Sequence, residues 1–94
     1  MRDFEWDDQK AAKNLETHHV SFETAIAVFA DPRLVIVDTT REQDGEPRAK
    51  AIGVIQDRLF AIVFTLRGAT VRLISARRAN RNEERAYGYD PPSA

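Results

Sequence analysis

The residues of this sequence that are best suited to chemistry are arginines, which gather where a strand pattern gives way to a helix pattern. From Arg67 to Arg85 the chain has six Arg and two Glu, although its net charge is −1. A guanidinium group is a planar fork that binds phosphate through paired hydrogen bonds. The cluster therefore predicts a phosphate-binding site. Solvated surface charge is an equally open interpretation of the same spacing.

Charge is divided unequally between the two halves of the chain. Residues 1–46 carry five Lys/Arg and eleven Asp/Glu, whereas residues 47–94 carry nine Lys/Arg and four Asp/Glu. Positive charge concentrated in one half of a chain indicates a surface that binds a polyanion. The acidic half would either limit non-specific binding of nucleic acid or face a basic partner.

The predicted phosphate clamp consists of Arg48, Arg72, Arg77 and Arg78. We expect these guanidinium groups to converge on one pocket sized for a phosphodiester. In the alternative, two of the four are ion-paired with acidic residues such as Glu46 or Glu84. Lys10 and Arg81 are expected to support substrate binding.

Two side chains are candidates for proton transfer, His18 and Glu46. Imidazole can take or give a proton near neutral pH. Because Arg48 would stabilise the charged carboxylate, Glu46 fits a general base, or an orienter of Arg48, better than an acid. The alternative for His18 is a capping or packing role in the turn between helices, since a lone His is more often structural. His19 beside it points elsewhere and makes a poor metal pair, so we expect no metal and no cofactor.

The apolar pattern predicts the elements that must position these side chains. Helices are expected over 8–16, 21–30 and 79–87, and strands over 34–38, 48–56, 59–66 and 70–76, with a short edge strand at 4–6. Asp7 or Asp8 and Ser21 are the expected N-caps. The order predicts an α+β fold with two N-terminal helices, an antiparallel sheet of four or five strands and a C-terminal helix.

Several finer expectations follow from these patterns. Strand 34–38, rich in β-branched residues, is predicted to be buried. Strict alternation would place Val71, Leu73 and Ser75 on one sheet face and Arg72, Ile74 and Ala76 on the other. Asn14 is expected to be exposed beside Lys10, and residues 17–19 to connect the first two helices.

The totals bound the class of protein. Ninety-four residues predict one domain, 1–94, with a loose tail at 88–94. No apolar run approaches the ~20 residues of a membrane span, and the start lacks the apolar region of a secretory signal. Cysteine is absent, which excludes disulfides and a thiol nucleophile. We expect a cytoplasmic protein without a membrane partner.

Several segments together resemble BrnT-type toxins from Phe4 to Tyr87. They are FEWD from Phe4, then His18-x-Val20-Ser21-Phe22, Asp31-Pro32, Glu46-x-Arg48, Ile52-Gly53 and ISARRA from Ile74. The resemblance implies a RelE-like fold and an endoribonuclease toxin of a type II toxin–antitoxin pair, which cleaves RNA without metal and inhibits translation. It also implies an antitoxin of the ribbon-helix-helix, BrnA type that neutralises the toxin and binds operator DNA.

The chain departs from this family pattern around His18. Thr17-His18-His19 stands where the family commonly has Lys-His-Gly, and Thr24 replaces a second Glu. These departures keep a second hypothesis open, a catalytically weak module of the same fold that binds antitoxin or RNA without turnover. The sequence does not fix whether the chain forms a homodimer or a higher complex with its antitoxin.

Overall fold

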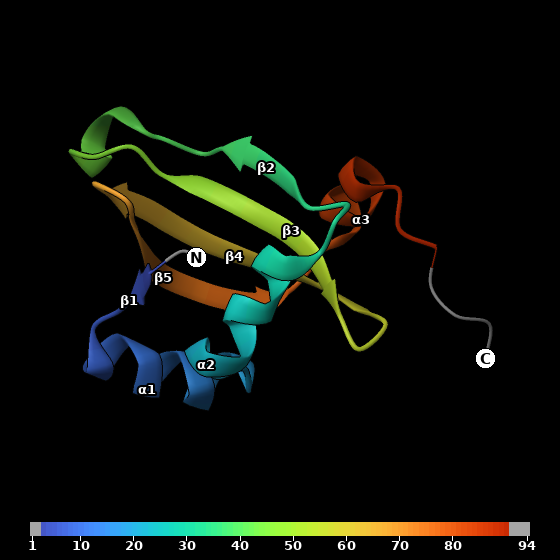
Figure 1. Cartoon of the computed structure of the whole chain (residues 1–94), viewed down its shortest axis with the longest axis horizontal. Coiled ribbons are helices and arrows are strands. Elements are labelled where there is room, and N and C mark those ends of the chain that lie inside the picture. Colours follow the sequence, from blue (N-terminus) through green and yellow to red (C-terminus); the bar gives the residue numbers. More distant parts are fainter. Residues whose placement is uncertain (1–2, 91–94) are drawn as a thin grey trace.

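A five-stranded sheet forms the centre of the molecule, with helices packed along one side and a short helix at one end (Figure 1). The computed structural model describes residues 3–90. Its elements are β1 (Asp3–Glu5), α1 (Asp8–His18), α2 (Phe22–Ala25), the 3-10 helices η1 (Ile26–Ala30) and η2 (Glu42–Asp44), β2 (Val35–Asp38), β3 (Ala49–Ile55), β4 (Arg58–Arg67), β5 (Thr70–Arg78) and α3 (Arg81–Tyr87). The predicted α+β class is confirmed.

The strand order is β1-β5-β4-β3-β2, and the sheet is mixed rather than antiparallel. The three strand pairs from β2 to β5 are antiparallel, but β1 lies parallel to β5, with Asp3 opposite Thr70 and Glu5 opposite Arg72. Because β1 is so short, it covers only the first three residues of β5. Among the described residues, the remainder of β5 has no strand beside it on that side.

Asn14 of α1 fills this gap in the sheet. Its Nδ2 donates to the carbonyl oxygens of Ala76 and Val20, each at 2.9 Å, and its Oδ1 accepts from the Ala76 N–H at 3.0 Å. The side-chain amide thus makes the paired bonds that a neighbouring strand would make. Asn14 is only 6% exposed, so the expectation of an exposed Asn14 was wrong.

The first helix begins as predicted and ends later. The Asp7 carboxylate caps it by accepting from the Lys10 N–H at 2.9 Å. The helix continues to His18 and stops at His19, whose φ of 61° is left-handed. Thr17 and His18 are therefore helical, which corrects the predicted connection over residues 17–19.

The second predicted helix is divided into a short α-helix, α2, and a 3-10 helix, η1. Ser21 caps α2 by accepting from the Thr24 N–H at 3.1 Å, as expected. η1 lies so close to β3 that a Cβ added at Gly53 would meet Val28 Cγ1 at 3.0 Å and the Val28 carbonyl oxygen at 3.1 Å. Glycine at this position permits the close packing of η1 on the sheet.

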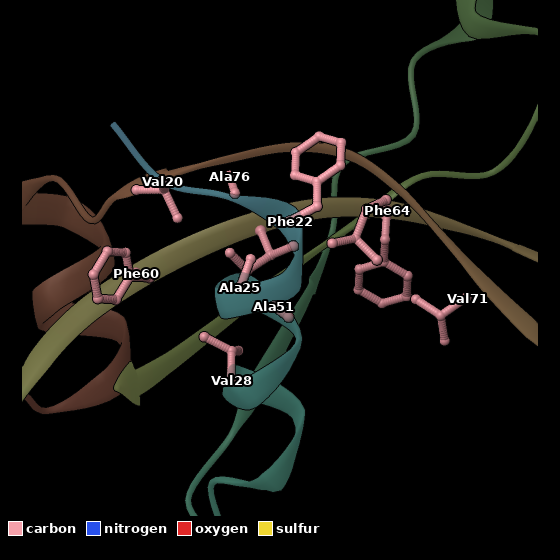
Figure 2. Packing of buried hydrophobic residues seen from close by; sticks show 11 residues of the cluster. Val20, Phe22, Ala25, Val28, Ala51, Phe60, Phe64, Val71 and Ala76 are labelled. Carbon is pink, nitrogen blue, oxygen red and sulfur yellow. The ribbon is translucent and has the colours of Figure 1, made fainter. Parts of the chain in front are cut away.

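The core lies mainly between the helices and the sheet. Figure 2 shows side chains from α2 and η1 packed among those of the strands; the cluster comprises Val20, Phe22, Ala25, Val28, Ala51, Phe60, Ile62, Phe64, Val71, Leu73 and Ala76. A smaller cluster joins Tyr87 of α3 to Ile52 of β3 and Leu59 of β4. β2 is an edge strand whose Ile36 is 51% exposed, so the prediction that it would be buried was wrong.

Asn14→Ala should lower the free energy of unfolding by about 3 kcal/mol, because it removes three buried hydrogen bonds. The N–H and carbonyl groups of Ala76 would then lose their partners. Urea denaturation measures the change. Lys13→Ala, at an adjacent exposed position of α1, is the control and should cost little. Equal losses for the two variants would contradict the bridging role of Asn14.

Candidate functional site

The side chains of β5 are distributed by a bulge. Phe64 lies opposite Leu73 and Val63 opposite Ser75, which leaves Ile74 as an extra residue. The extra residue reverses the alternation of faces. Leu73 and Ala76 therefore both point into the helix-side core, and Arg72, Ser75 and Arg77 share the other face. This corrects the prediction that Arg72 and Ala76 would share a face.

We call that other face the cationic face, after the four cations on which the argument depends: Arg48 and Lys50 from the β3 side, and Arg72 and Arg77 from β5. Register places Lys50 beside Val63, which lies beside Ser75, and places Thr65 beside Arg72. Short β4 side chains therefore form a floor between two rows of long cationic ones. Arg48, Arg41, Val63 and Ser75 line a hollow of about 300 Å³ there.

The backbone of Arg48 is fixed by the preceding loop. Its N–H donates to Thr40 Oγ1 at 2.8 Å, and its carbonyl oxygen accepts from the Thr39 N–H at 3.0 Å. On the other side, Thr65 Oγ1 donates to the carbonyl oxygen of Pro47. Hydrogen bonds on both sides therefore fix the backbone segment that carries the Arg48 side chain.

Arg72 and Arg77, two of the predicted arginines, each bind a carboxylate. Arg72 Nη1 lies 2.6 Å from Glu5 Oε2. Arg77 binds Glu83 through both terminal nitrogens, Nη1 to Oε1 at 2.7 Å and Nη2 to Oε2 at 2.8 Å. The alternative left open by the sequence is thus realised, although with Glu5 and Glu83 rather than Glu46 and Glu84.

Glu83 is buried and bound by several donors at once. It is 2% exposed, and besides Arg77 it accepts from Lys50 Nζ at 2.8 Å and from the Asn80 N–H at 2.8 Å. Burial alone would raise its pKa, but hydrogen bonds from Arg77, Lys50 and Asn80 lower the pKa from 4.5 to about 2. Glu83 also completes the capping box of α3, so one carboxylate joins β3, β5 and α3.

Arg78 lies on the opposite face, which contradicts the expected convergence of all four guanidinium groups. Its Cα partner is Phe60, and its guanidinium lies 5.6 Å from the Phe60 ring centroid. It lines a groove of about 540 Å³ with His18 and Arg58. His18 also lines a hollow of about 560 Å³ with Lys10, and that hollow shares Ile74 with the hollow on the cationic face.

The other predicted site residues lie further out. Glu46 reaches Arg67 Nη2 at 3.8 Å, next to the loop that carries Arg48, and its side chain is 34% exposed. Arg81 is exposed in the first turn of α3. The structure therefore brings Arg48, Arg72 and Arg77 onto one face of the sheet and Arg78 onto the opposite face. Lys10 and His18 lie on α1, beyond the β5 edge.

Sequence reasoning overlooked Lys50, Glu83 and the pair formed by Asp31 and Tyr87. Tyr87 Oη donates to Asp31 Oδ2 at 2.6 Å. Burial raises the pKa of Asp31, but the bonds from Tyr87 and two backbone N–H groups outweigh it, so the pKa falls below its usual value. Burial and the bond to Asp31 raise the pKa of Tyr87. The spacing of Arg48 and Lys50, two apart in a strand, was the signal that could have revealed Lys50.

An apolar groove borders the cationic face. The exposed side chains of Ile36 and Leu66, 51% and 57% accessible, line a hollow of about 350 Å³ with Phe64 and Arg48. Arg48 also lines the hollow on the cationic face. The two surfaces therefore meet at this side chain.

Glu83→Gln should remove an acid-sensitive part of the stability. Because the folded-state pKa lies below the ordinary 4.5, ionised Glu83 contributes about 3 kcal/mol at pH values above about 4.5, and this contribution disappears as the pH falls towards 2. Urea denaturation across that range should show a smaller difference between wild type and variant at low pH. Glu84→Gln, the same change one position away, is the control. Parallel curves for wild type and Glu83→Gln would contradict the role of Glu83.

Among the described residues, no helix is long and apolar enough to cross a membrane. Within residues 3–90, no group of three or more His, Asp or Glu side chains is placed to hold a metal ion.

Comparison with known proteins identifies the family. None of the curated proteins compared with the chain matches it. The sequence model of a family described as the ribonuclease toxin, BrnT, of type II toxin–antitoxin systems matches residues 6–83. The match covers most of the 94 residues, including β3, β4 and β5 with all four cations of the cationic face. The chain belongs to the BrnT family of ribonuclease toxins.

Proposed function

We propose that this chain is an endoribonuclease toxin that cleaves RNA without a metal ion and so inhibits translation in the cytoplasm. The observation that carries the proposal is the cationic face, which gathers Arg48, Lys50, Arg72 and Arg77 on a protein of net charge −1. A local concentration of cations over a neutral floor suits a single-stranded polyanion. Membership of a ribonuclease toxin family supports RNA as that polyanion.

The proposed reaction begins with the ribose 2′-OH, which attacks the adjacent phosphorus. Glu46, the carboxylate next to the Arg48 segment, takes the proton of that hydroxyl. Arg48 and Arg72 bind the phosphate oxygens and stabilise the charge that develops on them. The bond from phosphorus to the 5′ oxygen breaks, leaving a 2′,3′-cyclic phosphate.

The departing 5′ oxygen needs a proton. His18 lies beyond Ile74, in a hollow that shares Ile74 with the cationic face. An RNA strand that crosses this bulge would bring its leaving group towards His18, with Lys10 in the same hollow and Arg78 in the adjoining groove. We therefore assign His18 as the general acid, and Lys10 and Arg78 as cations that guide the RNA.

A second candidate function is a weak or inactive module that binds antitoxin or RNA without turnover. One observation favours it: Arg72 and Arg77 are engaged by Glu5 and Glu83, which leaves less charge for a transition state. Turnover separates the two candidates.

The purified chain should cleave single-stranded RNA in the presence of a metal chelator and release 2′,3′-cyclic phosphate ends. Arg48→Ala should slow cleavage by about 100-fold, because it removes a stabiliser of the phosphate charge. Glu46→Gln should slow it by a similar or larger factor. Arg85→Ala, an exposed arginine of α3, is the control and should leave the rate unchanged. Intact RNA beside a protein with a normal circular dichroism spectrum would favour the second candidate.

Membership of a type II toxin family implies an antitoxin partner. We propose that it is a ribbon-helix-helix protein that binds operator DNA, and that an apolar segment of it occupies the groove of Ile36 and Leu66. Exposed apolar side chains that share one hollow are typical of a protein interface. Because Arg48 lines both this groove and the cationic face, an occupant would cover a residue that the reaction needs.

The double variant Ile36→Gln, Leu66→Gln should keep its RNA cleavage and escape neutralisation. Polar side chains in the groove oppose burial of an apolar partner, and because they are neutral they add no charge beside Arg48. Co-expression with the antitoxin and a growth assay measure the escape. Ala86→Gln is the matched control, an exposed position of α3 that lines neither groove. Full neutralisation of the double variant would place the antitoxin elsewhere.

A further inference from the structure

Lys50 occupies the middle of the cationic face. It is two residues from Arg48 along the same strand face, about 6.6 Å at the usual rise of a strand. Across β4 it is level with Ser75, through their common neighbour Val63. Its side chain is 21% exposed. A phosphate chain that reached the hollow beside Arg48 would therefore pass Lys50.

Lys50 shares a carboxylate with Arg77. Its Nζ lies 2.8 Å from Glu83 Oε2, the oxygen that also accepts from Arg77 Nη2 at 2.8 Å. Two positive charges thus meet one negative charge, and the group keeps a net charge of +1. An ammonium group has three N–H donors, and the contact with Glu83 engages only one of them. Donors remain for a further acceptor.

Glu83 lies deeper in the protein than the two cations that it binds. Glu83 is 2% exposed, whereas the side chains of Lys50 and Arg77 are 21% and 33% exposed. The cations therefore stand between the carboxylate and solvent, and an approaching anion meets them first. Glu83 holds the two cations side by side, which spares the anion part of the cost of ordering two long side chains.

We propose that Lys50 and Arg77 form a phosphate subsite, adjacent to the one at Arg48, and that Glu83 is the residue that positions them. The RNA backbone then lies along the cationic face, with one phosphate at Arg48 and another at Lys50 and Arg77. This inference rests on RNA being the substrate, as proposed above. It adds a binding residue on β3 and a positioning residue on α3.

Binding without cleavage tests the subsite. A fluorescein-labelled single-stranded oligothymidylate lacks the 2′-OH nucleophile, so its anisotropy reports affinity alone. Between about 50 and 200 mM salt, Lys50→Met should weaken binding and reduce the slope of log K against log salt by about 0.7, the value for one lost phosphate contact on a single strand. Lys50→Arg should keep the slope, and Lys13→Met, an exposed lysine of α1, should leave it unchanged.

Glu83→Gln supplies a test of opposite sign. The variant raises the net charge by one. If Glu83 merely repelled RNA, the variant would therefore bind the oligonucleotide more tightly than the wild type does. If Glu83 positions the two cations, Glu83→Gln should instead weaken binding severalfold. The melting temperature of each variant identifies any that fails to fold, and the two Lys50 variants then decide alone, since they leave the Glu83–Arg77 pair in place.

The outcomes separate this inference from the proposed function. A Lys50→Met slope equal to that of the wild type, or a wild-type protein that does not bind the oligonucleotide, would overturn the subsite even if RNA is cleaved. A reduced slope in a protein that leaves RNA intact would uphold the subsite and favour the binding module without turnover.

Discussion

The buried carboxylate of Glu83 is the interaction on which the C-terminal half of the structure depends. Removing a carboxylate from water costs several kcal/mol unless cations and donors replace the lost hydration. Lys50, Arg77 and the Asn80 N–H supply that replacement from β3, β5 and the start of α3. A helix of seven residues is marginal by itself. Glu83 at its beginning binds β3 and β5, and Tyr87 at its end binds Asp31, which accepts from the Val54 N–H of β3. The Glu83 contacts also orient two cations of the cationic face.

The edge of β5 decides how the remaining charges are distributed. β1 is too short to cover β5, Asn14 takes the place of the missing strand at Ala76, and Ile74 bulges between the two. The bulge turns Arg77 towards Arg72 and leaves Arg78 with Phe60 on the other face. One extra residue therefore divides a run of arginines between two surfaces. It also places the cationic face and the hollow of His18 on either side of a single side chain.

The sequence predicted most of the elements, because apolar periodicity and local capping are properties of short segments. Asp7 and Ser21 begin helices as expected, since a side-chain oxygen next to unpaired N–H groups acts without help from the rest of the fold. Strand 34–38 looked buried from its β-branched residues, but composition does not reveal whether a strand lies at the edge of a sheet. Asn14 looked exposed in a polar helix because its partner, Ala76, lies 62 residues away.

The site was predictable only in part, for a related reason. The residue types showed that phosphate chemistry was plausible, and Arg48, Arg72 and Arg77 do share a face. The separation of Arg78 depends on a bulge, which alternation cannot reveal. The pairing of Arg77 depends on which glutamate of α3 turns inwards. The spacing of Asn80 and Glu83 in the sequence matches a capping box. That spacing indicates Glu83, and not Glu84, as the glutamate that turns back towards the start of α3.

RNA and antitoxin, which we propose compete for the surface at Arg48, should respond differently to salt. RNA binding through phosphates weakens steeply as salt rises. Burial of Ile36 and Leu66 is apolar, and salt does not screen it. An antitoxin that occupies the groove therefore keeps its affinity at ionic strengths where RNA loses much of its own. Covering Arg48 from the apolar side lets a protein partner exclude RNA without matching every charge of the cationic face.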